Sequence, residues 1–267
     1  MTKPKLILDF DGTLTDVDKN FHIYEARFAE VFSEDRGISR QEISALLEDA
    51  KNKIKSDPLR GWEKNGVIVA PAIVDPFVFN AVAYQDICQN MGVEPEVRDG
   101  LLQQCYREAY KILPTTFREG IESFFSEVEE RYDPFVVTNS DPNHVARELE
   151  SIGLKDVRVI GDAKKFLVDQ NWNEVPVSMQ PQGFPRAVML RKAHYARALA
   201  NIGAQPQDTT VMGDIYELDL ALPDYLRMKT VLMVKDCTPD YEIAHVSKNP
   251  RGQIVRNLQE AKRVLLK

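Results

Sequence analysis

Two aspartates that follow a short apolar run near the start of the chain constrain the fold more than any other feature. The run KLIL at residues 5–8 has strand character, and Asp9, Asp11, Gly12 and Thr13 come directly after it. Residues i and i+2 of an extended chain face the same side, so the two carboxylates converge. Carboxylates held this close repel each other. A site that holds both of them therefore binds a cation between them or shares one proton between them. The sequence therefore predicts a metal site at the end of a buried strand, where open α/β sheets hold ligands.

The alternative interpretation of this stretch is a strand followed by an ordinary Asp-Gly turn, which is a common hairpin signal. If each residue type fills roughly one position in twenty, four fixed residues match a given start with a chance on the order of 10⁻⁵. We therefore favour the metal site over the plain turn.

Composition and charge exclude several classes of protein. The chain has 267 residues, of which 43% are hydrophobic and 28% are charged, as in ordinary globular proteins. Its net charge of −7 argues against nucleic-acid binding, because no broad basic field replaces the counterions of phosphates. No apolar run is long enough for a membrane span, and three cysteines without metal-ligand spacing fit reduced thiols. We expect a cytoplasmic protein with a small-molecule partner, and we find no signal for an oligomeric state.

The periodicity of the chain divides it into a core and an insertion. After residue 15 the apolar residues recur at helical intervals, and the strand pattern returns only after residue 115. We expect a mainly helical insertion over residues 16–115 and a core of residues 1–15 and 116–267. The other interpretation is that all of these helices belong to one continuous core. The core alternates helix and strand, which predicts an α/β class with a Rossmann-like parallel sheet and helices on both faces.

The least regular part of the chain covers residues 166–187. It contains several prolines and too little periodicity for a helix, so we predict a small hairpin or a long loop. A helix is expected after it, over residues 188–202.

Polar residues follow three separate apolar runs of the predicted sheet. Asp9 follows the first run, residues 138–140 (Thr-Asn-Ser) follow the second, and Asp214 follows the third. The carboxyl ends of parallel strands lie along one edge of a sheet, so residues far apart in the sequence share one cleft. The Thr-Asn-Ser group taken alone is also ordinary turn chemistry.

Three segments resemble motifs of one known family. DFDGTL at residues 9–14 resembles the first motif of the haloacid dehalogenase (HAD) superfamily, whose members are mostly magnesium-dependent phosphatases. Residues 138–140 are similar to the second motif, in which a threonine holds a phosphoryl oxygen. GDIYELD at residues 213–219 is similar to the fourth motif, which holds the metal. The resemblance implies that the insertion is a helical cap that closes over the active site and selects the substrate.

The resemblance also implies a role for each site residue. Asp9 is the nucleophile that forms an aspartyl-phosphate, and Asp11 is the general acid and base. Thr138 takes part in catalysis and, with Asn139, binds the substrate. Mg²⁺ is the implied cofactor, bound by Asp9, by the main-chain carbonyl of Asp11 and by Asp214. Oxygen ligands favour this ion over zinc.

The sequence does not decide which residue is the lysine of the third motif or which is the second acid of the fourth motif. The usual lysine-proline pair of the third motif is absent, so we choose Lys192 as the catalytic lysine and place Lys165, which we also assign to substrate binding, and Lys164 next. For any one of them a surface position is the default. Asp219 has the spacing of the second acid, and Glu217 competes with it. Either acid could simply begin a helix, where negative charge is favourable.

The resemblance therefore implies a Mg²⁺-dependent phosphatase that hydrolyses a small phosphorylated metabolite through an aspartyl-phosphate. Asp11 argues against the dehalogenase branch, because displacing a halide requires no acid to protonate an alcohol. A phosphomutase of the same superfamily is the nearest alternative, and it would need the intermediate shielded from water. A catalytically idle binding or regulatory protein with the HAD fold is the alternative from another class. The intact set of Asp9, Asp11, Thr138 and Asp214 argues against it.

Overall fold

The computed structural model describes residues 3–57 and 59–267, which form two compact units. The core unit contains the residues up to Asp16, Lys64–Ala70 and Phe117–Lys267, and the second unit contains Val17–Glu63 and Pro71–Thr116. These bounds differ from the predicted insertion because Lys64–Ala70 groups with the core. The predicted domains also include residues 1, 2 and 58, which lie outside the described residues. The role of the insertion as a lid stays a prediction.

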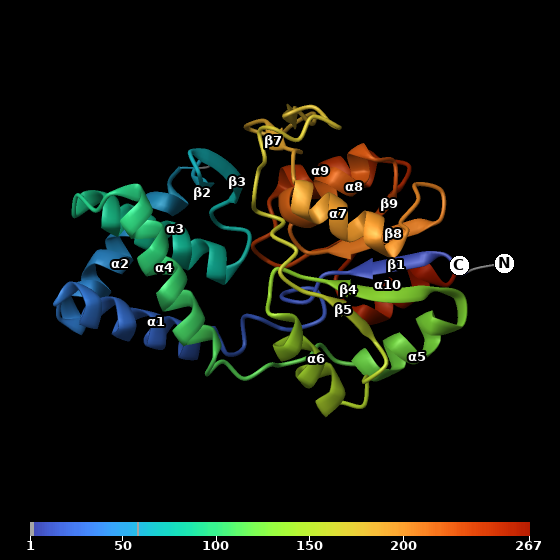
Figure 1. The fold of residues 1–267 in the computed structure, drawn as a ribbon, viewed down its shortest axis with the longest axis horizontal. Helices are drawn as coiled ribbons and strands as arrows, with labels where there is room; N and C mark the ends of the chain where they lie inside the picture. The colour runs from blue at the N-terminus through green and yellow to red at the C-terminus, as the bar shows by residue number, and fades with distance from the viewer. Residues whose placement is uncertain (1–2, 58) are drawn as a thin grey trace. The chain divides into compact units, whose positions relative to one another are not determined.

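The core unit is built on a six-stranded parallel sheet (Figure 1). The strand order is β10-β9-β8-β1-β4-β5, and its described pairs are all parallel. The strands are β1 (Lys5–Leu8), β4 (Asp133–Val137), β5 (Arg158–Ile160), β8 (Thr209–Gly213), β9 (Lys229–Met233) and β10 (Gly252–Val255). This arrangement confirms the α/β class and the parallel sheet predicted from the alternating patterns.

Helices cover both faces of the sheet, because successive strand residues point to opposite sides. The helices of the core unit are α5 (Ile121–Arg131), α6 (Pro142–Ser151), α7 (Ala193–Ile202), α8 (Ala221–Tyr225), α9 (Asp240–Lys248) and α10 (Leu258–Leu265). Ile7 packs in one apolar core with residues of α7, α8 and α9, and its neighbours Leu6 and Leu8 pack in another with α5, α6 and α10. A strand buried on both faces is apolar at every position, as residues 6–8 are.

The second unit is mainly helical, as its periodicity predicted. Its helices are α1 (Phe21–Arg36), α2 (Arg40–Lys55), α3 (Pro76–Asn90) and α4 (Pro95–Tyr110). The rings of Phe28 and Phe32 lie 4.6 and 4.8 Å from the ring of Tyr84, and all three side chains are buried. Such aromatic pairs contribute about 0.5–1.5 kcal/mol each beyond the area that they bury.

A hairpin that the sequence reasoning missed lies within the predicted helical insertion. Its strands are β2 (Gly61–Lys64) and β3 (Val67–Pro71), which form a two-stranded sheet. Asn65 and Gly66 join them with φ angles of 50° and 75°. An Asn-Gly pair favours this left-handed backbone in two-residue hairpin loops, so the pair was the local signal for the hairpin.

A second small hairpin begins in the irregular segment and its second strand lies just after that segment, which agrees in part with one of the two predictions for it. β6 (Ser178–Met179) pairs antiparallel with β7 (Val188–Met189). The helix predicted over residues 188–202 is therefore wrong in its first part, and α7 begins only at Ala193. Short apolar runs do not distinguish helix from strand, and here the pairing with residues nine and eleven positions earlier in the chain makes residues 188–189 a strand.

Cys88 and Cys105 are buried thiols that form no disulfide. Burial raises the pKa of the Cys88 thiol to about 11 and that of Cys105 to about 12, so both thiols stay protonated at neutral pH. Among the residues that the structure describes, no helix combines the length and the apolar character needed to cross a bilayer.

Candidate active site

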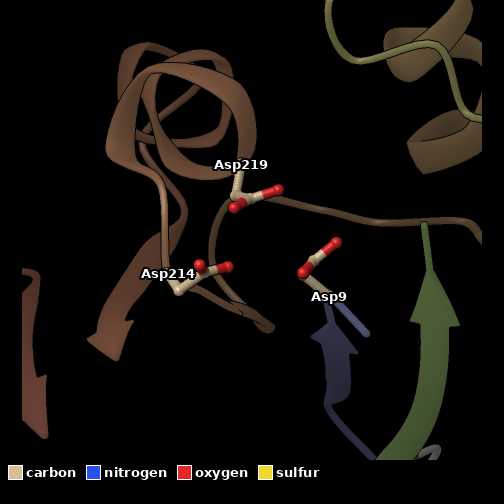
Figure 2. Close-up of side chains that lie close together, drawn as sticks. All are labelled: Asp9, Asp214 and Asp219. Atoms are coloured by element: carbon tan, nitrogen blue, oxygen red, sulfur yellow. The ribbon is translucent and has the colours of Figure 1, made fainter. Parts of the chain in front are cut away.

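Three aspartates meet at the carboxyl edge of the sheet (Figure 2). Asp9 follows β1, Asp214 follows the neighbouring strand β8, and Asp219 lies in the π-helical turn η1 (Tyr216–Leu220). One carboxylate oxygen from each lies within 4.8 Å of the others, and all three residues are buried. The parallel pairing fixes this arrangement, because the Asp9 N–H donates to the Met212 carbonyl at 2.9 Å.

Two glycines leave the space that the three carboxylates occupy. Gly12 adopts a φ of 81°, and a Cβ atom there would lie 2.4 Å from Asp214 Oδ2. A Cβ atom at Gly213 would lie 2.3 Å from Asp219 Cβ and 2.7 Å from its Cγ. Both positions therefore require glycine for a local steric reason.

We expect Gly213→Ala to destabilise the protein by about 1–3 kcal/mol, because the added methyl group displaces Asp219 or the turn that carries it. Urea unfolding followed by circular dichroism measures the change. Gly100→Ala is the matched control, since the same Cβ in α4 meets no atom within 4 Å and alanine favours a helix. Equal unfolding free energies for the two variants would contradict the steric account.

Lys165 contacts two of the three clustered carboxylates. Its ammonium lies 2.7 Å from Asp9 Oδ1 and 2.8 Å from Asp219 Oδ1, and its side chain is 1% exposed. Burial alone would lower the pKa of Lys165, but Asp219 and Asp9 outweigh it and raise this pKa, so the ammonium stays charged. Lys164, the residue before it, adopts a left-handed φ of 47°.

Lys192, the first choice from the sequence, lies elsewhere in the same region. Its buried ammonium donates to the main-chain carbonyls of Glu217 and Leu218 in η1. Burial lowers the pKa of Lys192 to about 8. Tyr195 Oη also donates to the Asp219 carbonyl at 2.8 Å. Lys192 therefore holds the turn that presents Asp219, and Lys165 replaces it as the lysine beside the carboxylates.

The charge of the cluster suits a bound cation. Burial raises the pKa of Asp9 well above its usual range, and Asp219 and Asp214 raise it further against the opposing effect of Lys165. Ionising all three carboxylates therefore requires more positive charge than the two ammonium groups that contact them, those of Lys165 and Lys235, supply. Carboxylate oxygens are the ligands that Mg²⁺ prefers, so the donor set fits this ion.

The loop after β4 supplies polar groups next to Asp11. Ser140 Oγ donates to Asp11 Oδ2 at 2.5 Å, and the Thr138 hydroxyl accepts from the Ser140 N–H at 3.1 Å. The carboxylate of Asp11 is thus directed to this loop and is separate from the three clustered carboxylates. Asn139 Oδ1 accepts from the Lys165 N–H at 2.7 Å, so Asn139 fixes the backbone that carries the lysine.

The structure separates the two acids that competed for the fourth motif. Asp219 joins the cluster, whereas Glu217 forms an ion pair with Arg186 at 2.7 Å. Arg186 comes from the irregular segment that the sequence left least defined. That segment therefore helps to hold η1 from outside the cluster.

The buried Glu242 should make the free energy of unfolding depend on pH. Its Oε2 accepts from the Tyr216 N–H at 3.2 Å, and burial raises its pKa well above the usual range, with a further increase from Glu217. The folded protein then binds a proton that the unfolded chain has lost, so the free energy of unfolding falls as pH rises from about 4.5 through the folded pKa.

We expect Glu242→Gln to remove the share of Glu242 in this slope, at most about 1.4 kcal/mol per pH unit. The variant should gain stability relative to the wild type at about pH 8 and not at about pH 5. Urea unfolding at a series of pH values in the presence of a chelator measures both profiles. Parallel profiles would contradict the raised pKa.

The sequence reasoning missed Lys235 and the contacts of Thr13. Lys235 Nζ lies 2.6 Å from Asp214 Oδ2. Thr13 Oγ1 lies 3.1 Å from Asp214 Oδ1 and 3.3 Å from Asp9 Oδ2, so its hydroxyl bridges the two strand ends. The signal for Lys235 was present, since this polar residue comes two positions after the end of strand β9.

Comparisons with known proteins identify solved structures that share the fold of this chain. No family model and no curated protein matches the chain. Among solved structures, the HAD-hydrolase YfnB from Bacillus subtilis, solved with bound magnesium, is 16% identical, and the match covers 99% of both chains with a TM-score of 0.54. A predicted phosphatase from Clostridium acetobutylicum is 15% identical, with 100% of this chain and 99% of that chain covered and a TM-score of 0.57.

A third similar structure is the haloacid dehalogenase-like protein SP0104 from Streptococcus pneumoniae. It is 12% identical, covers 98% of both chains and has a TM-score of 0.57. Matches over nearly the whole chain show that it has the fold of the HAD hydrolases. They confirm the resemblance drawn from the motifs at the level of the fold.

Proposed function

We propose that this chain, which has the fold of the HAD hydrolases, is a Mg²⁺-dependent phosphatase that acts on a small phosphorylated metabolite in the cytoplasm. The observation that carries the proposal is the buried cluster of Asp9, Asp214 and Asp219, with Lys165 bound to two of the three. Phosphoryl transfer needs this combination, because the anionic group must be held by positive charge while it meets a nucleophilic carboxylate.

In the proposed reaction, Asp9 attacks phosphorus in line and the bond to the leaving oxygen breaks. Asp11 donates its proton to that oxygen, which leaves as an alcohol. The ionised Asp11 then takes a proton from a water molecule that attacks the acyl phosphate on Asp9. Inorganic phosphate leaves, and both carboxyl groups return to their starting states. The hydrogen bond from Ser140 to Asp11 orients the acid for these two proton transfers.

The residues that would hold Mg²⁺ are Asp9, Asp214 and Asp219, with the main-chain carbonyl of Asp11 as the resemblance implies. When bound, the ion offsets the charge of the carboxylates and of the phosphoryl oxygens. Lys165 keeps Asp9 oriented through its contact with Asp9 Oδ1. Thr138, at the end of β4, is proposed to donate its hydroxyl proton to a phosphoryl oxygen.

A screen of phosphorylated sugars, nucleotides and organic acids, with and without Mg²⁺, tests the proposal by release of inorganic phosphate. An Asp9→Asn variant serves as the blank. We expect Mg²⁺-dependent release from at least one compound and none from the blank. Conversion of a substrate into its isomer without release would indicate a phosphomutase. Absence of turnover across several divalent metals would support an idle binding protein instead.

A further inference from the structure

Lys235 is a second buried cation at the carboxylate cluster. It follows β9, its side chain is 5% exposed, and its ammonium lies 2.6 Å from Asp214 Oδ2, whose side chain is 1% exposed. Thr238 holds the backbone there: the Lys235 N–H donates to Thr238 Oγ1 at 2.9 Å, and the Thr238 N–H donates to the Lys235 carbonyl at 3.1 Å. Lys235 is therefore held in place from its own loop.

Gly12 leaves the room for this contact. A Cβ atom at Gly12 would lie 3.1 Å from Lys235 Nζ and 2.4 Å from Asp214 Oδ2. The two lysines of the site divide the carboxylates between them, because Lys165 contacts Asp9 and Asp219 while Lys235 contacts Asp214. A positive charge thus lies against each of the three.

The two ligands of the proposed reaction, a cation and a phosphoryl group, are favoured by opposite charges at this site. A cation bound by the carboxylates is favoured by negative charge, and a phosphoryl group at the same site is favoured by positive charge. A fixed ammonium beside Asp214 repels the first ligand and attracts the second. In a buried site both effects are weakly screened by solvent.

We propose that the charge of Lys235 lowers the affinity of the site for Mg²⁺ and raises the affinity of the site for phosphate. This inference rests on the proposed function. A purely structural role for Lys235 makes a different prediction: without its support for Asp214, the affinities for both ligands would fall together.

Lys235→Met tests the proposal by titration calorimetry of Mg²⁺ alone, and of inorganic phosphate in saturating Mg²⁺. We expect Mg²⁺ to bind about tenfold more tightly than in the wild type, and phosphate about tenfold more weakly. Lys235→Arg, which keeps the charge, should stay close to the wild type in both titrations. Lys229→Met is the matched control, because it makes the same change at the exposed start of the same strand.

Thermal melts give a readout that does not depend on turnover. With a chelator present, Lys235→Met should melt below the wild type, because Asp214 has lost its buried partner. Addition of Mg²⁺ should raise the melting temperature of the variant by more than it raises that of the wild type. Lys235→Gln provides a second variant if the methionine variant is too unstable to titrate.

The outcomes separate this inference from the proposed function. A wild-type protein that binds no Mg²⁺ would overturn the proposed function and this inference with it. A wild type that binds Mg²⁺, with Lys235→Met binding it equally well or more weakly, would overturn the inference alone. Failure of both neutral variants to fold would also contradict it, since Lys235 would then be a structural residue.

Discussion

Asp9→Asn is expected to lower kcat by at least about 10⁴-fold, because a neutral amide oxygen replaces the carboxylate proposed to attack phosphorus. The variant should stay folded, since it removes a buried acid whose pKa is raised by burial and by the nearby Asp219 and Asp214. The amide oxygen in the place of Asp9 Oδ1 still accepts from Lys165. The amide N–H in the place of Oδ2 can donate to the Thr13 hydroxyl, which is then left to donate to Asp214. Phosphate release at saturating Mg²⁺ measures the loss, and a thermal melt verifies the fold.

Asp156→Asn is the matched control for this substitution, because Asp156 lies exposed in the same unit. It should leave kcat unchanged. If Asp9→Asn retained a kcat within about a hundredfold of the wild type, Asp9 would be excluded as the nucleophile.

Lys165→Met is expected to destabilise the protein by about 3–5 kcal/mol at neutral pH, because it leaves Asp9 and Asp219 as buried charges without their partner. It should also abolish measurable phosphate release. The stability loss should shrink at about pH 5, because burial raises the pKa of Asp9 and a protonated Asp9 no longer needs a charged partner. Urea unfolding at two pH values with a chelator present measures this difference.

Lys192→Met is the matched control for that experiment. It removes an equally buried lysine whose partners are two main-chain carbonyls, so we expect a loss of about 1–3 kcal/mol. Because carbonyls do not titrate, its loss should not shrink at low pH. If Lys192→Met showed the larger, pH-dependent loss, the assignment of Lys165 as the lysine of the carboxylate cluster would be wrong.

Local sequence patterns predicted the parallel sheet well, because strands covered on both faces are apolar at every position. They failed for short segments whose structure depends on pairing with another segment of the chain. Residues 188–189 are apolar enough to continue into the helix that follows, but they pair with β6 instead. The hairpin of β2 and β3 was missed although Asn65 and Gly66 carried its turn signal, because it interrupts a stretch that is otherwise helical.

The sequence by itself determined that acids stand at the ends of β1 and β8, because strand periodicity and the polar residue after each run are local properties of the chain. It also determined that these ends share one edge, which follows from parallel pairing. Only the tertiary structure decided that Lys165 rather than Lys192, and Asp219 rather than Glu217, lie at the carboxylates. Those contacts join residues that are about 50 to 160 positions apart in the sequence. Whether such residues lie close together in space depends on the order of the strands and on the paths of the loops.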